Sequence, residues 1–290
     1  MQNYLLYQAL QSTDLVNECR YSLLKYLSVY NLKPPANTSV VIYTDQPAMF
    51  EEFESFFHGF EMQPVDAEEK KMWRGTQNST ERLKIHVLRD FFETYTGNVL
   101  YCDTNTYALA PIDGIFQNIS SGIVHLHEEK HPEKWQHIFR DKSIDINGEK
   151  VQLNVTMKFF DTAIIGVNSN VKPLLNNIVA LNDSIYNQFT QNNTEDFAFS
   201  YYLQLLHTIK TSNHVIAHYY NLNEFQELLR VFFKKNEEES IPNQIKLVQN
   251  IDALEIQRNK IHYNKLPLYK KLLNAITGKQ WSIKEYQNKI

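Results

Sequence analysis

The chain has 290 residues, of which 43% are apolar and 21% charged, so it is long enough to bury a large hydrophobic core. Its net charge of -4 and pI near 6.2 argue against nucleic-acid binding, which usually requires a basic balance. The first ten residues carry no basic region followed by an apolar one, and no stretch approaches the length of a membrane-spanning helix. Cys19 and Cys102 lack metal or disulfide spacing. We therefore expect a cytoplasmic protein with two buried, reduced thiols.

Strand-like and helical patterns alternate along the first two thirds of the chain, as in a sheet with crossover helices. Residues 4–10 predict a strand, and apolar residues at helical spacing follow it over 16–30. Residues 39–45 predict a second strand, after which Pro47 suits the first turn of a helix. Residues 98–103 form a continuous apolar run, which predicts a central strand that is covered on both faces.

A predicted helix over residues 78–92 precedes this central strand. Asn78 and Glu81 have the spacing of a capping box. Arg82 and Lys84 add positive charge to the first turn, where the helix dipole is already positive. Two interpretations stay open: solvated surface residues, or a phosphate site, because helix N-termini and Arg forks both suit phosphate oxygens.

The central predicted strand ends at Asp103, and Thr104 and Asn105 follow it. In open α/β sheets, ligands collect outside the carboxyl ends of the strands. A carboxylate and a carboxamide two residues apart can bind one hard cation, Mg²⁺ or Mn²⁺, together with substrate phosphates. The alternative, which is favoured for an isolated Asp-x-Asn, is a turn in which both side chains bond their own backbone.

A resemblance to a known family starts in residues 82–116, which read RLKIHVLRDFFETYTGNVLYCDTNTYALAPIDGIF. This segment resembles the core of the GT-A-fold glycosyltransferases, in particular the glycogenin-like and lipopolysaccharide-galactosyltransferase-like group. In that group, an Arg-Leu helix precedes a strand, an Asp-x-Asp motif and a Pro-Ile-Asp segment. Three later stretches are similar to further family motifs in the same order: FFDTAIIGVNS (159–169), NTEDFAFSYYL (193–203) and IAHYYNLNEF (216–225). The chain thus resembles uncharacterised bacterial members of this superfamily over residues 4–233.

The resemblance implies a GT-A-type α/β domain over residues 1–235, with a mixed, mostly parallel central sheet flanked by helices. Residues 236–290 would form a basic, helical C-terminal extension. The implied activity is transfer of a hexose from a nucleotide diphosphate sugar, a UDP-sugar before others, to a glycan or lipid-linked acceptor, with retention at the anomeric carbon. Mn²⁺ or Mg²⁺ would neutralise the charge that develops on the departing diphosphate. The competing hypothesis is a degenerate member that binds nucleotide or glycan without transfer.

The resemblance also implies three sets of site residues. The metal ligands would be Asp103, Asn105 and His218. The donor-binding residues would be Asp45, Arg82, Lys84, Asp103 and Thr104. The polar groups that face the donor and acceptor sugars, and hence the catalytic candidates, would be Asp161, Glu195 and Asp196.

Two departures from the family pattern affect these expectations. Asn105 replaces the second carboxylate of the Asp-x-Asp pair, so we expect a weaker cation site. The last motif lacks the family's glycine and lysine, and Asn221 and Asn223 cannot supply a cationic contact to the β-phosphate. Either Lys84 or another basic group replaces that contact, or the protein retains binding alone.

Three histidines lie in residues 125–131. His125, His127 and His131, with Glu128, have the residue types of a zinc site, which would suit a hydrolase. An acceptor-side loop or surface histidines explain the same residues and are favoured. Close to the last motif, His214 competes with His218 for the metal role, and the Tyr-Tyr-Asn that follows favours His218.

A hairpin is predicted over residues 145–155, around Asn147 and Gly148, with Val151, Leu153 and Val155 alternating. It would form either a flap beside the acceptor site or an added edge of the sheet.

The C-terminal tail is basic and amphipathic, with eight Lys or Arg and one acidic residue from Arg258 onward. Its interleaved apolar residues are Tyr263, Leu266, Tyr269, Leu272, Leu273, Ile276 and Trp281. Such a tail can lie on an anionic membrane surface, in peripheral contact at the inner face. The favoured alternative is that its aromatic face packs back on the domain and its lysines stay in water.

Overall fold

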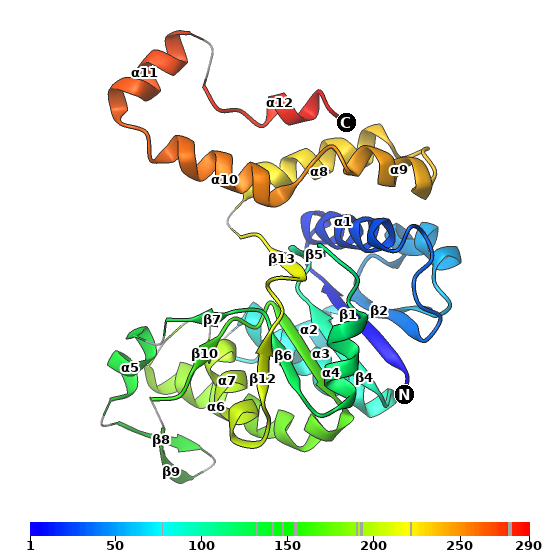
Figure 1. Ribbon diagram of the computed structural model, residues 1–290. Coiled ribbons are helices and arrows are strands. Elements are labelled where there is room, and N and C mark those ends of the chain that lie inside the picture. The colour runs from blue at the N-terminus through cyan, green and yellow to red at the C-terminus, as the bar shows by residue number, and fades with distance from the viewer. Residues whose placement is uncertain are drawn as a thin grey trace.

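The computed structural model describes residues 1–290 apart from 77, 132, 141, 147, 154–155, 190, 192–193, 221 and 278–279, and only the backbone of 134 and 149. A seven-stranded sheet runs through the centre of the molecule (Figure 1). Its strands, in spatial order, are β12 (Ile209–Thr211), β6 (Val124–Leu126), β11 (Ile164–Asn168), β4 (Asn98–Cys102), β1 (Asn3–Ala9), β2 (Thr38–Thr44) and β3 (Phe60–Pro64).

The sheet is mixed and mostly parallel. β1 pairs in parallel with β2 and β4, β2 with β3, and β6 with β12. β11 runs antiparallel between β4 and β6. β4 occupies the centre and is buried at every position, as its apolar run predicts. The expected fold class, an α/β protein with a mixed, mostly parallel sheet flanked by helices, is confirmed.

Alternate residues of the strands enter two hydrophobic cores, because successive side chains of a strand point to opposite faces. Leu5 and Tyr7 of β1 contribute to one core and Leu6 to the other. The helices on the side of Leu5 are α1 (Thr13–Val29), the 3₁₀ helix η1 (Pro47–Phe56), α4 (Asp113–Ser120), α8 (Asn223–Lys235), α9 (Ile241–Val248), α10 (Ala253–Asn264) and α12 (Lys284–Gln287). Those on the side of Leu6 are α2 (Ala67–Arg74), α3 (Thr80–Thr94), α5 (Glu133–Phe139), α6 (Lys172–Phe189) and α7 (Thr194–Leu206).

Three two-stranded sheets accompany the central one among the described residues: β5 (Thr106–Ala108) with β13 (Ile216–His218), β7 (Glu129–Lys130) with β10 (Phe159–Phe160), and β8 (Ser143–Ile146) with β9 (Glu149–Gln152). The last is the predicted hairpin, although residues 147 and 155 lie outside the described part of the chain. Because β8 pairs with β9 and not with the central sheet, the alternative of an added sheet edge is wrong.

Helix α3 is capped differently from the prediction. Ser79 is its N-cap, and the Ser79 hydroxyl accepts a hydrogen bond from the Arg82 backbone N–H at 3.2 Å. Asn78 has φ of 50°, in the left-handed region, and therefore turns the chain before the helix begins. The capping box predicted from Asn78 and Glu81 is therefore wrong, and the N-cap lies one residue later than expected.

The C-terminal residues divide into a packed part and an exposed part. Ile283, Tyr286 and Ile290 are buried in the core on the side of Leu5, and α9 adds buried residues to the same core. Helix α11 (Leu268–Ile276) has no buried residue and stands out from the body of the molecule (Figure 1). The expectation that the tail packs back on the domain thus holds for its end and is wrong for α11. The proposed domain boundary at residue 235 stays a prediction. None of the helices described is both long and apolar enough to cross a bilayer.

Candidate functional site

The chain makes a tight turn where β4 ends. The backbone N–H of Asp103 donates to the Ala163 carbonyl at 2.8 Å, which ties this turn to the start of β11. The backbone and hydroxyl of Thr106 both donate to the Asp103 carbonyl, at 3.1 and 2.7 Å. Because Thr106 closes the turn, the side chains of Asp103 and Asn105 are not used for it. The favoured alternative, a turn held by these two side chains, is wrong.

The Asp103 carboxylate is paired with a buried lysine. Lys84 of α3 places its Nζ 3.0 Å from Oδ2, and the Tyr101 hydroxyl donates to Oδ1 at 2.9 Å. The same Nζ donates to the Thr162 carbonyl at 2.9 Å. Burial alone would lower the pKa of Lys84, but the nearby carboxylates, Asp103 first among them, raise it above its ordinary value. Lys84 is therefore a permanent positive charge beneath Asp103.

Asn105 and His218 are brought together by the pairing of β13 with β5, in which His218 lies opposite Thr106. The Asn105 amide donates to the Tyr219 carbonyl at 2.7 Å, and the Tyr219 N–H donates back to the Asn105 carbonyl at 3.1 Å. This leaves the carboxamide oxygen of Asn105 on the opposite side of its planar group. Three segments that are distant in the sequence thus meet at the carboxyl end of β4.

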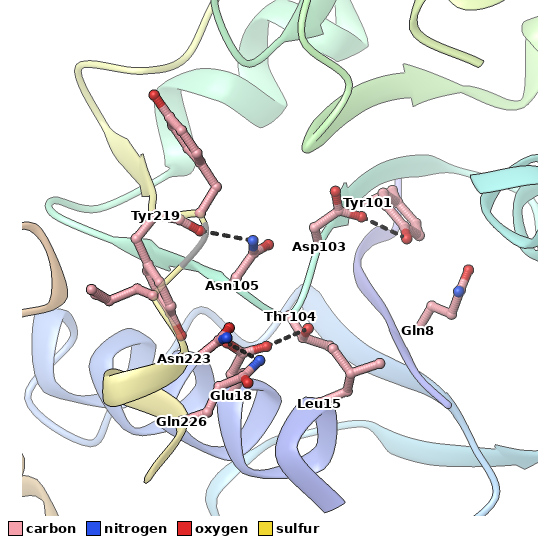
Figure 2. Close-up of a pocket in the computed structure, with 12 residues that line it drawn as sticks. Gln8, Leu15, Glu18, Tyr101, Asp103, Thr104, Asn105, Tyr219, Asn223 and Gln226 are labelled. Atoms are coloured by element: carbon pink, nitrogen blue, oxygen red, sulfur yellow. Dashed lines mark hydrogen bonds between the residues drawn. The ribbon is translucent and has the colours of Figure 1, made fainter. Parts of the chain in front are cut away.

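A cavity of about 310 Å³ opens at this edge of the sheet. Figure 2 shows its lining, which combines the turn at residues 103–105, Gln8 of β1, Leu15 and Glu18 of α1, and a later group made of Tyr219, Tyr220, Leu222, Asn223 and Gln226. The lining is mainly polar, and its walls come from several elements. Such a cavity suits a polar, hydroxyl-rich or charged ligand.

A second group of charges lies around Asp161. Lys130 Nζ is 2.8 Å from Asp161 Oδ2 and 3.0 Å from Asp196 Oδ2. The other oxygen of Asp161 accepts from the Ala163 N–H at 2.7 Å, and that of Asp196 accepts from the Thr162 N–H at 2.9 Å. Burial raises the pKa of Asp161, but His218 and Lys130 outweigh it and hold that pKa well below its usual range. Asp161 therefore stays ionised at any physiological pH.

Glu195 contrasts with its neighbour Asp196. It is 5% exposed at the start of α7, and its Oε2 has no hydrogen-bond partner among the described residues. Burial, and next the negative charge of Asp196, raise the pKa of Glu195 to about 8. Both effects favour the neutral form of Glu195, a carboxylic acid that can donate a proton or a hydrogen bond.

His127, Asp161 and His218 form a cluster in which one potential ligand atom of each lies within 4.8 Å of the others. His218 Nδ1 is 3.7 Å from Asp161 Oδ2, and the two imidazole rings meet edge to face with their centroids 5.2 Å apart. The expected metal set was Asp103, Asn105 and His218. His127, which the sequence placed only in a separate zinc hypothesis, is a neighbour of His218.

Two of the expected donor-binding residues are engaged elsewhere. Arg82 forms a two-pronged ion pair with Asp183 of α6, at 2.8 and 3.0 Å, and also donates to the Trp73 carbonyl at 2.5 Å. Asp45 binds Lys70 at 2.6 Å. Because the guanidinium of Arg82 is held by these groups, the structure does not support a phosphate site on it.

The zinc hypothesis for residues 125–131 is not supported in the described part of the chain. Of its members, only His127 belongs to a cluster with metal-ligand geometry. His125 is buried and its Nε2 lies 3.1 Å from the Asn118 amide, while His131 is exposed. His214 is also exposed, so the choice of His218 over His214 agrees with the geometry.

The sequence interpretation missed Glu18. This residue is 3% exposed on α1 and lines the cavity, where it accepts hydrogen bonds from Thr104 at 3.4 Å and from Gln226 at 3.3 Å (Figure 2). Burial raises the pKa of Glu18 to about 7, against the lowering effect of these two bonds. Glu18 directly precedes Cys19, which belongs to the apolar stripe of the predicted helix. An acidic residue next to that stripe was the signal that could have revealed it.

Comparisons with known proteins give similarity in fold alone. No family model matches this chain, and neither does any curated protein. Among solved structures, the chain is similar to mouse xyloside xylosyltransferase 1 in its apo form, with 8% identity over 73% of this chain and 85% of that one, and a TM-score of 0.46.

Two further structures have the same TM-score of 0.46. The glycosyltransferase GlyE of Streptococcus pneumoniae matches with 7% identity over 84% of this chain and 51% of its own, so this chain spans about half of GlyE. An active-site mutant of LgtC matches with 11% identity over 68% and 69% of the two chains. At these identities and TM-scores the likeness concerns the general arrangement of sheet and helices, and no residue role follows from it.

Proposed function

We propose that the protein is a glycosyltransferase that takes a sugar from a nucleotide diphosphate donor. The sequence resemblance over residues 4–233 suggests this class, and one geometric observation supports it most. Asp103, Asp161 and His218, which come from three separate motifs, lie at one edge of the sheet, and Asp103 lines a polar cavity there. Ligand sites of α/β proteins form at this edge.

The charged side chains at this edge of the sheet support the proposal that a diphosphate donor binds together with a cation. Asp103, Asp161 and Asp196 are three carboxylates that face two ammonium groups, Lys84 and Lys130, so these five groups carry a formal net charge of -1. A diphosphate would add further negative charge in a partly buried site. The proposal therefore includes a divalent cation, Mn²⁺ or Mg²⁺, which would supply positive charge to the departing diphosphate.

The three cation ligands implied by the resemblance, Asp103, Asn105 and His218, suit this cation only in part. Asn105 offers a carboxamide oxygen and His218 an imidazole, but both Asp103 oxygens are already engaged, by Lys84 and Tyr101. A cation at Asp103 would have to displace Lys84, whose Nζ would keep the Thr162 carbonyl as an acceptor. Asp103 and Asn105 are thus proposed as groups that face the diphosphate, with Lys84 as the fixed positive charge behind them.

The remaining proposed roles follow the charge pattern. Asp161 and Asp196, fixed by Lys130 and by backbone N–H groups, are suited to accept hydrogen bonds from sugar hydroxyls. Glu195 is proposed as a neutral acid behind Asp196. Asp45 and Arg82 keep a proposed part in shaping the donor site through their ion pairs. UDP-sugars are the donors to test first.

Donor turnover tests the proposal. Hydrolysis and transfer would be measured with a panel of UDP-, GDP- and CMP-sugars, each with Mn²⁺, with Mg²⁺ and with EDTA. We expect turnover of at least one donor, and a loss of about a hundredfold or more in Asp103→Asn, against no change in the matched surface variant Asp90→Asn. Equal rates in wild type and Asp103→Asn would overturn the site.

One observation favours the non-catalytic alternative. A carboxylate that is already paired with Lys84, next to an asparagine in place of aspartate, is the arrangement of a weakened metal site. Thermal shifts with UDP, with no turnover of any donor, would establish this alternative, since a ligand that binds only the native state raises its apparent stability.

Helix α11 supports a proposed peripheral contact with the membrane, where lipid-linked acceptors lie. Its exposed apolar residues are Leu268, Tyr269, Leu272, Leu273 and Ile276. Lys270 and Lys271 are on the same helix. An apolar face with lysines beside it suits an anionic bilayer surface, so we propose that the protein works in the cytoplasm at the inner face of a membrane.

A further inference from the structure

Three strands deliver the cluster of His127, Asp161 and His218 to one point. His127 directly follows β6, Asp161 directly follows β10, and His218 ends β13. His127 and Asp161 are also bonded through the backbone, since the His127 N–H donates to the Asp161 carbonyl at 3.0 Å. His127 and Asp161 are buried, and His218 is partly buried. The three side chains therefore sit on a rigid frame.

The hydrogen bonds of His127 fix which ring nitrogen is free. Its Nε2 lies 3.2 Å from the Ile216 carbonyl oxygen, which can only accept, so Nε2 carries the proton. Nδ1 is then unprotonated, and it is buried without a hydrogen-bond partner among the described residues. A buried lone pair without a partner is costly in a folded protein. A ring nitrogen whose opposite N–H is held by a carbonyl is the usual state of a metal-binding histidine.

Asp161 is also oriented by a hydrogen bond from the backbone. The Ala163 N–H holds one Asp161 oxygen at 2.7 Å, while the other oxygen lies 3.7 Å from His218 Nδ1. Metal bonds of about 2.1 Å place neighbouring ligand atoms roughly 3.0–3.4 Å apart. The ligand atoms of the cluster lie within 4.8 Å of one another, so the widest pair would have to approach by up to about 1.4–1.8 Å. We propose that His127, Asp161 and His218 bind a divalent transition metal ion, with Zn²⁺ or Mn²⁺ preferred to Mg²⁺.

The ligand types decide this preference. Two imidazole nitrogens and one carboxylate suit transition metals, whereas Mg²⁺ selects oxygen ligands. Three protein ligands also leave positions open for water or for an oxygen of a substrate. The site differs from the set of Asp103, Asn105 and His218 because it replaces Asp103 and Asn105 by Asp161 and His127. It does not require the proposed glycosyl transfer, since the bare ion is enough to test it.

Lys130 provides a second test of this metal site, because it competes with the ion for Asp161. Its ammonium lies 2.8 Å from the Asp161 oxygen that faces His218, where it competes with a metal ion for the same negative charge. Its side chain is 34% exposed and has Asp196 as a second partner at 3.0 Å, so it can withdraw from Asp161. Removal of this positive charge should strengthen metal binding. Damage to the fold would weaken binding, so an increase in affinity distinguishes the two effects.

The experiment measures metal affinity of the full chain, freed of metal by EDTA and then dialysed, by competition with a chromogenic chelator. We expect one Zn²⁺ per chain and at least about a hundredfold preference for Zn²⁺ over Mg²⁺. His127→Gln should weaken Zn²⁺ binding by at least about tenfold, and Lys130→Met should strengthen it by about tenfold. The matched control His125→Gln, a buried histidine on β6 outside the cluster, should stay within about twofold of wild type.

Four outcomes would overturn the assignment. They are the absence of stoichiometric Zn²⁺ binding, an unchanged affinity in His127→Gln, an unchanged or weaker affinity in Lys130→Met, and Mg²⁺ binding as tight as that of Zn²⁺. If Asp103→Asn weakens Zn²⁺ binding and His127→Gln does not, the ion belongs to Asp103 instead. All arms omit nucleotide and sugar, so a failure of the proposed transferase activity leaves this result intact.

Discussion

Replacement of Glu18 by glutamine should make the stability of the protein less dependent on pH. The Glu18 carboxyl is 3% exposed, and its pKa in the folded protein is about 7, compared with an ordinary value of 4.5. At 1.4 kcal/mol for each tenfold change in the protonation equilibrium, ionisation of Glu18 costs the folded state about 3 kcal/mol. Glutamine cannot ionise and has nearly the same shape. It can also still accept from Gln226 while its amide donates to Thr104.

The sign of the effect follows from the raised pKa. Below pH 4.5 Glu18 is protonated in the folded and unfolded chain, so its ionisation has no effect. As the pH rises from 4.5 to about 7, the unfolded chain ionises Glu18 and the folded chain does not, so wild type loses stability that Glu18→Gln retains. Urea unfolding at pH 4.5 and pH 8.5 should therefore show similar stabilities at the lower pH and an advantage of about 3 kcal/mol for the variant at the higher one.

Glu227→Gln, on the exposed surface of α8, is the matched control and should behave as wild type at both pH values. The reasoning about burial fails if Glu18→Gln and wild type differ by the same amount at pH 4.5 and pH 8.5. An advantage at pH 8.5 that Glu227→Gln shares would assign the effect to net charge and not to the buried site.

Three further predictions concern charge, packing and the membrane. Lys84→Met should destabilise the protein by about 2 kcal/mol in urea unfolding. This is less than the loss expected for a fully buried ion pair, because the Asp103 side chain is 28% exposed. Adding Asp103→Asn to the same chain should restore part of the lost stability. Gly166→Ala should cost about 1–3 kcal/mol in the same assay, because its Cβ would lie 2.9 Å from the Cβ of His125; wild-type stability would contradict this. Leu272→Glu should weaken cosedimentation with anionic vesicles about tenfold or more without a change in unfolding, and unchanged binding would remove α11 from the membrane contact.

Much of the fold could be predicted because local patterns and burial agree along the chain. The unbroken apolar run of residues 98–103 predicts a central strand, and β4 lies at the centre of the sheet. The direction of β11 was not predictable from such a pattern, since a buried strand has the same apolar composition whether it runs parallel or antiparallel. That direction matters for the site, because it places Ala163 beside Asp103.

The site could be predicted less well than the fold, because it depends on contacts between residues that are distant in the sequence. Arg82 at a helix N-terminus has the sequence context of a phosphate ligand, but Asp183, which is 101 residues later, holds its guanidinium. The interaction of a charged group with the helix dipole contributes a few tenths of a kcal/mol to about 1 kcal/mol. A two-pronged ion pair in a partly buried position exceeds this. No pattern within α3 could reveal that partner. In the same way, the tail's apolar residues predicted packing, whereas no residue of α11 is buried.

The two lysines, Lys84 and Lys130, allow several carboxylates to lie close together at this edge of the sheet. Lys84 lies on α3 and Lys130 on β7, and each bridges to an acidic residue from a different segment. Each lysine thus offsets the repulsion that would otherwise separate the turn at Asp103 from the start of β11 and from α7. A lysine that neutralises these carboxylates also opposes any cation that approaches them, so the ion pairs and metal binding compete for the same negative charge. Lys130 is partly exposed and can yield to an ion, whereas the buried Lys84 cannot do so as readily, which is why the Asp161 side of this edge is the better place for a metal.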